Sequence, residues 1–301
     1  MARSKNWVSR LAIFFVFLSL VFGVLLYRSC SRKTPPPPAP APSRTRVHEP
    51  RRTPAVPRDR TRPAPRTTTS TPPETPERAA TSAAIAILID DLGNDAAAVD
   101  HIARWPFPVS VAVLPELPAS GDTARTFERS GKQVLLHLPM EPRGFPGVRP
   151  GPGVVLRSQS DEEIASTLQN DLDTVPGAVG VNNHMGSAAT ADLRVMRAVA
   201  GVLAGRGLFF VDSRTTGSSV ALEAAREARV PSASRRVFLD DIQKEAAIED
   251  SLSQLISHAK REGPAIAIGH PYPTTLAVLD RELPRLAARG VRLVTIGEVV
   301  K

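Results

Sequence analysis

From residue 84 onward, short apolar runs alternate with longer segments in which apolar residues recur every three or four positions. The short runs are rich in Val, Ile and Leu, as buried strands are, and the longer segments have the period of amphipathic helices. Strands are expected at 84–90, 109–115, 133–139, 178–183, 208–213, 236–240, 265–270 and 292–297, and helices at 161–175, 191–206, 245–262 and 275–290. This alternation predicts an α/β domain with a parallel sheet.

Most of these predicted strands end in a polar residue that is able to do chemistry. These residues are Asp90, Asp91, His137, Asn182, Asn183, His184, Asp212, Asp240 and His270. Barrel enzymes gather their catalytic groups from the carboxyl ends of several strands, so the distribution predicts a parallel (β/α) barrel of seven or eight units with one site. A doubly wound open sheet is the alternative, because alternation alone does not show closure.

A Pro- and Gly-rich stretch at 141–159 interrupts this rhythm after the third predicted strand. Loops of this length without regular structure are usually functional. On the barrel interpretation the stretch lies over the active face and lines a substrate groove; a plain insertion is the alternative.

The N-terminal region has a different pattern. Residues 11–27 form an uncharged apolar stretch between Arg10 and Arg28, at the short limit for crossing a bilayer, so residues 1–30 are expected to be a cytoplasmic N-terminus and a membrane anchor. A cleaved signal peptide is the alternative, although no small-residue cleavage site follows. The flanking basic residues are nearly balanced and do not fix the orientation.

Residues 31–79 are rich in Pro, Arg and Thr and have almost no large apolar side chains. Such a segment cannot bury enough surface to fold, which predicts a disordered linker. A proline-rich partner motif is the alternative, but no protein partner can be identified. The folded domain is therefore expected at 80–301.

Net charge and cysteine content limit the expected binding partners and cross-links of the folded domain. The formal net charge is +8, but residues 1–79 hold 15 Lys and Arg against 4 Asp and Glu, so the folded part is slightly acidic. A nucleic-acid-binding surface needs its positive charge on the folded domain, so nucleic acid is excluded as the expected partner. The single cysteine, Cys30, leaves no intramolecular disulfide.

The strand ends carry the residue types of a metal site. Asp90 and Asp91 are adjacent carboxylates, and a cation on one of them stabilises the pair and leaves the other free as a base. Asp91, His137 and His184 supply the three N and O ligands typical of catalytic zinc, with Glu141 as an alternative or additional ligand. An aspartate N-cap and ordinary hydrogen-bonded histidines are the alternatives.

Four further residues have expected roles. His270 precedes a proline-flanked turn and is suited to protonate a leaving group, because the pKa of imidazole lies near working pH. Asp212 and Arg214 either orient a ligand or contact substrate, and Asn183 is a further expected substrate contact. A structural salt bridge is the alternative role for Arg214.

The motifs IAILIDDLGND, VLLHLPMEP, GPG, VPGAVGVNNHMGS, FFVDSRTT and AIAIGHPYP occur in this order between residues 84 and 298. Together they resemble the divergent polysaccharide deacetylases of bacteria, in the glycoside hydrolase/deacetylase β/α-barrel superfamily. The resemblance implies a distorted TIM-like barrel of the deacetylase type.

The resemblance also implies roles for individual residues. Asp90 resembles the catalytic base, Asp91 a metal ligand, and His137 the first of two ligand histidines. The position four residues after His137 is Glu141, so the usual His-x-x-x-His is absent, and His184 resembles the replacement ligand. His270 resembles the late histidine that acts as the acid.

The expected function is a metal-dependent hydrolase, with zinc, that removes acetyl groups from the amide or ester bonds of an envelope polysaccharide or glycan. The resemblance and the spacer-like linker place the barrel on the periplasmic side of a bacterial inner membrane, held by residues 11–27 as a single span. An inactive glycan-binding or envelope-scaffold protein on the same fold is the alternative, and a hydrolase of another bond is a second.

Overall fold

The computed structural model describes residues 83–300, and the predicted anchor and linker lie outside these residues. The sheet consists of β1 (Ala83–Leu92), β2 (Ser110–Val113), β3 (Gln133–Met140), β4 (Gly180–Met185), β5 (Phe209–Asp212), β6 (Ser232–Ser234), β7 (Val237–Phe238), β8 (Ala265–Gly269) and β9 (Val291–Val294). The helices are α2 (Ala96–Ala103), α3 (Ser120–Arg129), α4 (Asp161–Thr174), α5 (Leu193–Arg206), α6 (Ala221–Glu227), α7 (Glu245–Glu262) and α8 (Pro273–Glu282). No helix within residues 83–300 combines the length and the apolar character needed to span a membrane.

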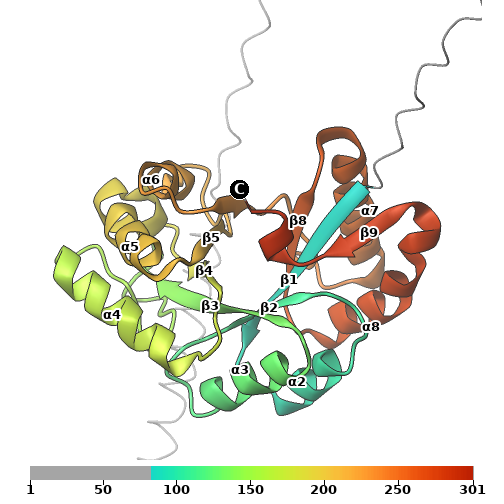
Figure 1. The fold of residues 1–301 in the computed structure, drawn as a ribbon, viewed down its shortest axis with the longest axis horizontal. Coiled ribbons are helices and arrows are strands. Elements are labelled where there is room, and N and C mark those ends of the chain that lie inside the picture. The colour runs from blue at the N-terminus through green and yellow to red at the C-terminus, as the bar shows by residue number, and fades with distance from the viewer. Residues whose placement is uncertain (1–82, 301) are drawn as a thin grey trace, which may run out of the picture. The chain divides into compact units, whose positions relative to one another are not determined.

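All strand pairs are parallel, and the strand order is β6-β5-β4-β3-β2-β1-β8-β7, with β9 paired to β1. The helices pack around the outside of the curved sheet (Figure 1). The architecture is a parallel β/α half-barrel, which confirms the predicted parallel β/α class. The full closure implied by a barrel of seven or eight units is not formed by strand pairing, since β6 and β7 are the two ends of the order.

The two end strands are joined by only two residues, Arg235 and Arg236. The backbone N–H of Arg235 donates to the carbonyl of Asp212 in β5, and that of Arg236 donates to the carbonyl of Ile266 in β8. One short extended segment therefore changes its partner from β5 to β8 and connects the two edges of the half-barrel.

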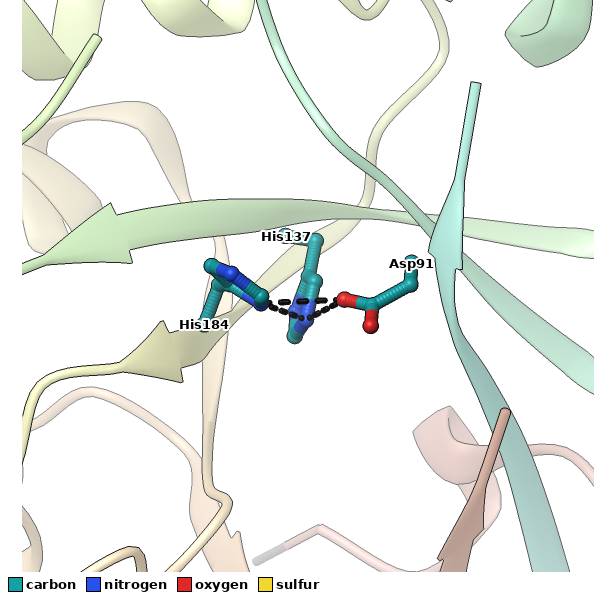
Figure 2. Close-up of side chains that lie close together, drawn as sticks. All are labelled: Asp91, His137 and His184. Carbon is teal, nitrogen blue, oxygen red and sulfur yellow. Dashed lines mark hydrogen bonds and ion pairs between the residues drawn. The ribbon is translucent and has the colours of Figure 1, made fainter. Parts of the chain in front are cut away.

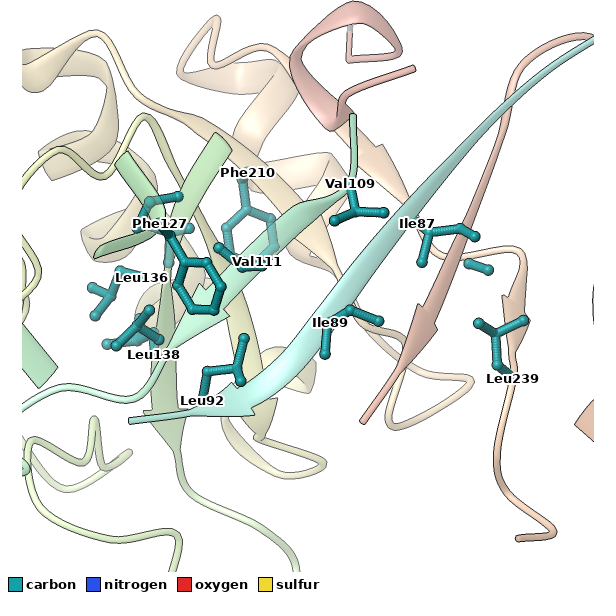
Figure 3. Packing of buried hydrophobic residues seen from close by; sticks show 14 of the residues in the cluster. Ile87, Ile89, Leu92, Val109, Val111, Phe127, Leu136, Leu138, Phe210 and Leu239 are labelled. Atoms are coloured by element: carbon teal, nitrogen blue, oxygen red, sulfur yellow. The ribbon is translucent and has the colours of Figure 1, made fainter. Parts of the chain in front are cut away.

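The core has an outer and an inner part, because successive side chains of a strand point to opposite faces. On β1, Ile85, Ile87 and Ile89 belong to the large cluster that contains the buried helix residues (Figure 3). Ala84 and Ala86 belong to a smaller cluster of strand and C-terminal residues that contains no α-helix residue. The outer face of β1 thus packs against the helices, and its inner face packs against other strands and the C-terminal segment.

Candidate metal centre

Asp91, His137 and His184 come from the ends of β1, β3 and β4, and their side chains converge (Figure 2). Asp91 Oδ1 lies 3.1 Å from His137 Nε2 and 2.9 Å from His184 Nδ1. The two ring nitrogens are 3.1 Å apart. Residues separated by up to 93 positions therefore present one oxygen and two nitrogens to a common point.

This convergence has the properties of a metal site. The three ligand atoms all lie within 4.8 Å of one another. Asp91 Oδ1 is buried and has no hydrogen-bond partner in the described part of the chain, although both ring nitrogens are close. A buried oxygen without a partner is costly. A cation at the shared point would satisfy that oxygen, and two imidazoles with one carboxylate are a donor set that catalytic zinc accepts. The residues fit a divalent metal.

The backbone of β1 brings both adjacent carboxylates to this point. In a regular strand Asp90 and Asp91 would point to opposite faces. Here the register with β2 shifts between Ile89 and Leu92, and Asp91 adopts a left-handed conformation with φ of 58°. As a result Asp90 Oδ2 lies 3.6 Å from His137 Nε2, the same nitrogen that Asp91 contacts. Bulges of this kind redirect side chains near active sites.

Asn182, in the middle of β4, connects Asp90 to His137. Its Nδ2 donates to Asp90 Oδ1 and Oδ2 at 2.9 and 3.0 Å, and its Oδ1 lies 2.9 Å from His137 Nδ1. An amide oxygen only accepts, so His137 carries a proton on Nδ1, and Nε2 is the nitrogen that faces the shared point. Asn182 Nδ2 also lies 3.2 Å from Ser213 Oγ. One side chain therefore orients both Asp90 and His137.

The two carboxylates have different electrostatic environments. Burial raises the pKa of Asp90 above its usual value, and the positive charge of His137 opposes this rise only in part. Burial acts in the same direction on Asp91, but the contacts and charge of His137 and His184 outweigh it and hold the pKa of Asp91 well below its usual range. The burial of His137 disfavours its charged form, yet the neighbouring carboxylates raise its pKa. Asp91 is thus the carboxylate that its neighbours hold in the charged form, and Asp90 is the carboxylate whose protonated form burial favours.

His270, at the end of β8, faces the centre from the other side of β1. Its Nδ1 lies 2.9 Å from Asp240 Oδ1, and its backbone N–H donates to Asp240 Oδ2 at 2.6 Å. Its Nε2 is 3.9 Å from Asp91 Oδ2. Burial opposes protonation of His270, but the hydrogen bond and charge of Asp240 outweigh it and raise the pKa of His270 to about 9. The imidazole is therefore protonated at neutral pH and can act as an acid.

The other candidate residues lie around this centre, but their side chains or backbone groups form hydrogen bonds with residues outside the three-ligand set. The Glu141 carboxylate accepts from the backbone N–H and Nε of Arg157 at 2.8 and 2.9 Å and is not one of the three clustered ligands. Asp212 Oδ1 accepts from the backbone N–H of Arg214, which has φ of 48°. Asn183 accepts from the backbone N–H of Ser213 and donates to the carbonyl of Met185. Its amide therefore ties β4 to the loop after β5.

Two residues hold neighbouring side chains of the site in place, but the sequence pattern identifies them only as polar residues at predicted strand ends. Asn182 and Asp240 stand at such ends, but the sequence gives no sign of which neighbour each would contact. Asp240 also accepts from Thr275 Oγ1 at 2.8 Å, so its carboxylate is fully occupied in holding the turn that carries His270. Phe238, whose ring stacks on His270 with centroids 6.0 Å apart, had no assigned role.

Comparison with known proteins identifies related chains. The chain is 40% identical over 198 residues to the YibQ protein of Escherichia coli strain K12, a match that covers 65% of this chain and 61% of that protein. It is 37% identical over 215 residues to a protein of Haemophilus influenzae, covering 71% and 76% of the two chains. The match thus spans less than two thirds of the Escherichia coli protein.

A solved structure and a family model extend the comparison. A crystal structure of a protein from Agrobacterium tumefaciens C58 superposes with a TM-score of 0.71 at 25% identity, covering 75% of this chain and 92% of that one. Residues 87–300 match the model of the divergent polysaccharide deacetylases. This range contains all the converging groups described above, and the chain therefore belongs to the divergent polysaccharide deacetylase family.

Proposed function

We propose that the protein is a zinc-dependent hydrolase that removes acetyl groups from a polysaccharide of the bacterial envelope. The observation that carries this proposal is that Asp90 and His270 each approach a different member of the ligand set: Asp90 Oδ2 lies 3.6 Å from His137 Nε2, and His270 Nε2 lies 3.9 Å from Asp91 Oδ2. A base, an acid and a metal-ligand set around one point are the parts that hydrolysis of an acetyl amide or ester requires. Family membership supports the same reaction class.

Asp91, His137 and His184 would hold the metal. A divalent metal in such a site polarises a carbonyl oxygen and lowers the pKa of water. Asn182 keeps the Nε2 lone pair of His137 directed at the shared point, because it occupies the other ring nitrogen. Thus the three ligands are positioned before any ion binds.

Asp90 would take the proton from the attacking water. It is only 2% exposed, and burial raises its pKa towards the pH at which a carboxylate is an effective base. The two hydrogen bonds from Asn182 hold the carboxylate in one orientation.

His270 would deliver a proton to the departing amine or alcohol. Asp240 fixes the ring through Nδ1, so the free Nε2 faces Asp91 and the shared point. Protonation at Nε2 is maintained at neutral pH because the pKa of His270 is about 9. Acid and base would therefore both lie next to the shared point.

We also propose that residues 11–27 anchor the chain in the inner membrane and that residues 83–300 act in the periplasm, where envelope polysaccharide lies. The apolar run and the Pro-rich segment that follows it support this proposal. Detection of the full-length chain in membrane fractions, together with protease access to residues 83–300 from the periplasm, tests it; recovery in the soluble fraction overturns it.

The reaction is tested by measuring acetate release from acetylated amino-sugar oligosaccharides by the full-length chain with zinc. Asp90→Asn should retain zinc and lose activity by about two to four orders of magnitude, since a general base contributes about that factor. Asp91→Asn should lose both zinc and activity. Asp100→Asn, an exposed aspartate on α2, is the matched control and should change neither.

Each outcome of this experiment has a defined meaning. Glycan binding without any acetate release would replace the enzyme with a glycan-binding protein. Release of sugar fragments instead of acetate would show hydrolysis of a different bond. Equal zinc content in Asp91→Asn and the unchanged chain would overturn the metal site.

A further inference from the structure

An arginine–hydroxyl cluster lies on the active face beside the metal centre. It consists of Arg143, Ser187, Thr216 and Ser218, from the loops after β3, β4 and β5. Arg143 Nη2 donates to Thr216 Oγ1 and Ser218 Oγ, each at 3.2 Å, and its backbone N–H donates to Ser187 Oγ at 3.1 Å. Thr216 and Ser218 hydroxyls are 3.1 Å apart. Three loops therefore bring a guanidinium and three hydroxyls together.

The cluster contains no carboxylate. Other arginines of the same face do have one: Arg157 pairs with Glu141 at 2.9 Å and Arg194 with Asp161 at 2.6 Å. Arg143, in contrast, contacts only hydroxyls through its guanidinium, and its side chain is exposed. An exposed guanidinium that is held in place by neutral hydroxyls keeps its charge available for an external anion.

A second arginine adjoins this cluster. Arg214 precedes Thr215 and Thr216, is exposed, and forms no ion pair with any residue in 83–300. Its backbone is fixed at both ends: its N–H donates to Asp212, and its carbonyl accepts from Arg235 Nη2 at 3.0 Å. Asp212 itself is 2% exposed, so it cannot neutralise an anion-binding surface from the solvent side. The loop thus presents a second guanidinium without a carboxylate partner.

Backbone and side-chain contacts connect the cluster to the metal ligands. Ser187 follows His184 by three residues, and Thr215 Oγ1 donates to the carbonyl of Met185 at 2.7 Å. Ser213, directly before Arg214, reaches Asn182 with its hydroxyl at 3.2 Å. A polymer with one sugar at the metal centre would therefore place neighbouring sugars along these loops.

We infer that the substrate glycan carries an anionic group, a carboxylate or a phosphate, that Arg143 and Arg214 bind beside the hydrolysed acetyl group. This inference rests on the proposed function and adds the charge of the substrate to it. Guanidinium groups match both anions because two N–H groups can face two oxygens. Thr216 and Ser218 provide hydroxyl donors to the same group.

The test is calorimetric binding of the full-length, zinc-loaded chain to two oligosaccharide series of acetylated amino sugars. One series is neutral, and the other carries a carboxylate on alternate sugars. The chain should bind the carboxylate series at least about tenfold more tightly, and this preference should weaken as salt increases. Inorganic phosphate as a competitor distinguishes a site for phosphate from one selective for carboxylate.

Arg143→Gln and Arg214→Gln should each remove most of this preference and leave binding of the neutral series unchanged. The matched control is Arg226→Gln, which removes the same charge from an exposed arginine near the C-terminal end of α6 and should preserve the preference. Equal binding of both series, or equal loss in the control, overturns the inference.

Acetate release measured on the same two series separates this inference from the proposed function. Deacetylation of both series at the same rate would reject the anionic substrate and leave the deacetylase in place. Arginine-dependent binding of the carboxylate series without any acetate release would retain the anion site and reject the reaction.

Discussion

Asn182 is the residue on which the orientation of both Asp90 and His137 depends. Asn182→Ala removes two donors from Asp90 and the acceptor from His137 Nδ1. We expect zinc affinity to fall about 10- to 100-fold, as it does when the outer partner of a ligating histidine is lost. Competition of the full-length chain with a zinc chelator measures this. Asn94→Ala, at an exposed position, is the control, and equal affinity in the two variants would contradict the role of Asn182.

Asp171, on α4, is fully buried, and neither of its carboxylate oxygens has a hydrogen-bond partner among residues 83–300. Burial and, to a lesser extent, the charge of Glu116 raise the pKa of Asp171 to about 8. In the unfolded chain this carboxyl ionises near pH 4, as a model aspartate does. Between these values the folded state holds a proton that the unfolded state has lost, so Asp171 reduces stability as pH rises.

The difference between the pKa of Asp171 in the folded and unfolded states predicts that the free energy of unfolding depends on pH. The free energy of unfolding should fall by up to about 1.4 kcal/mol per pH unit between roughly pH 5 and 8 because of this one group. Urea unfolding of the full-length chain at several pH values measures the slope, and in Asp171→Asn the contribution should be absent. Identical slopes in the two proteins would show that Asp171 is already ionised in the folded state.

The sequence predicted the convergence of Asp91, His137 and His184 because carboxyl ends of parallel strands share one edge. It did not predict how Asp90 and Asp91 reach the same nitrogen, because the register shift and the left-handed φ of Asp91 depend on pairing with β2. Glu141 was interpreted as a ligand because it follows His137 by four residues. Its contact with Arg157, sixteen residues later, depends instead on the fold of the intervening loop. Side-chain partners across strands are set by register, which one sequence does not reveal.

At the scale of the elements, β4 and β5 pack with no space between Gly180 and Phe209. A Cβ added to Gly180 would lie 2.3 Å from the Phe209 ring. Gly180→Ala must therefore displace a buried aromatic ring or the strand, and we expect it to lower the free energy of unfolding by about 1–3 kcal/mol or more. Urea unfolding of the full-length chain is the measurement.

Gly201 provides the matched control for this substitution. It lies in α5, and a Cβ at this position would meet nothing within 4 Å. Gly201→Ala should raise the free energy of unfolding by about 0.5–1 kcal/mol, because alanine loses less backbone entropy in a helix. Similar effects of the two substitutions would contradict the close packing of β4 on Phe209.

The predicted strands and long helices agree with the observed elements to within a few residues where the apolar pattern is strong, as in β1, β3 and α7. The strand expected at 236–240 is shorter, and β6 precedes it with the sequence Ser-Ala-Ser, which has no apolar run. The short helices α2, α3 and α6 were not among those predicted. Such elements exist because their neighbours pair with them or cover them, and local pattern does not contain that information.

At the scale of the whole molecule, metal binding should be coupled to folding, since the three ligands come from three strands. At a free zinc concentration of about 100 times the Kd, binding adds about 2.7 kcal/mol to stability. For a domain of this size that corresponds to a rise in Tm of about 5–10 °C. Thermal unfolding of the full-length chain with zinc and with a chelator measures it. Asp91→Asn should show no shift, and a shift of equal size in that variant would contradict the ligand set.

The parallel β/α organisation was predictable because strands and helices alternate in the sequence, but the way the edges meet was not. The connection between the two edges depends on Arg235 and Arg236, because the backbone N–H of Arg235 bonds to β5 and that of Arg236 bonds to β8. Nothing in the local pattern distinguishes such a segment from an ordinary strand.

The change of partner between β6 and β7 makes the ring of strands a split one, and its seam adjoins one of the groups that would react, because the ring of Phe238 in β7 stacks on His270. Asp91, His137, His184 and His270 all stand on the uninterrupted run β4-β3-β2-β1-β8. Movement at the seam would therefore shift His270 before it shifted the three clustered ligands on β1, β3 and β4. A bulky polymer that widened the seam would in this way also change the alignment of His270 with the ligand set.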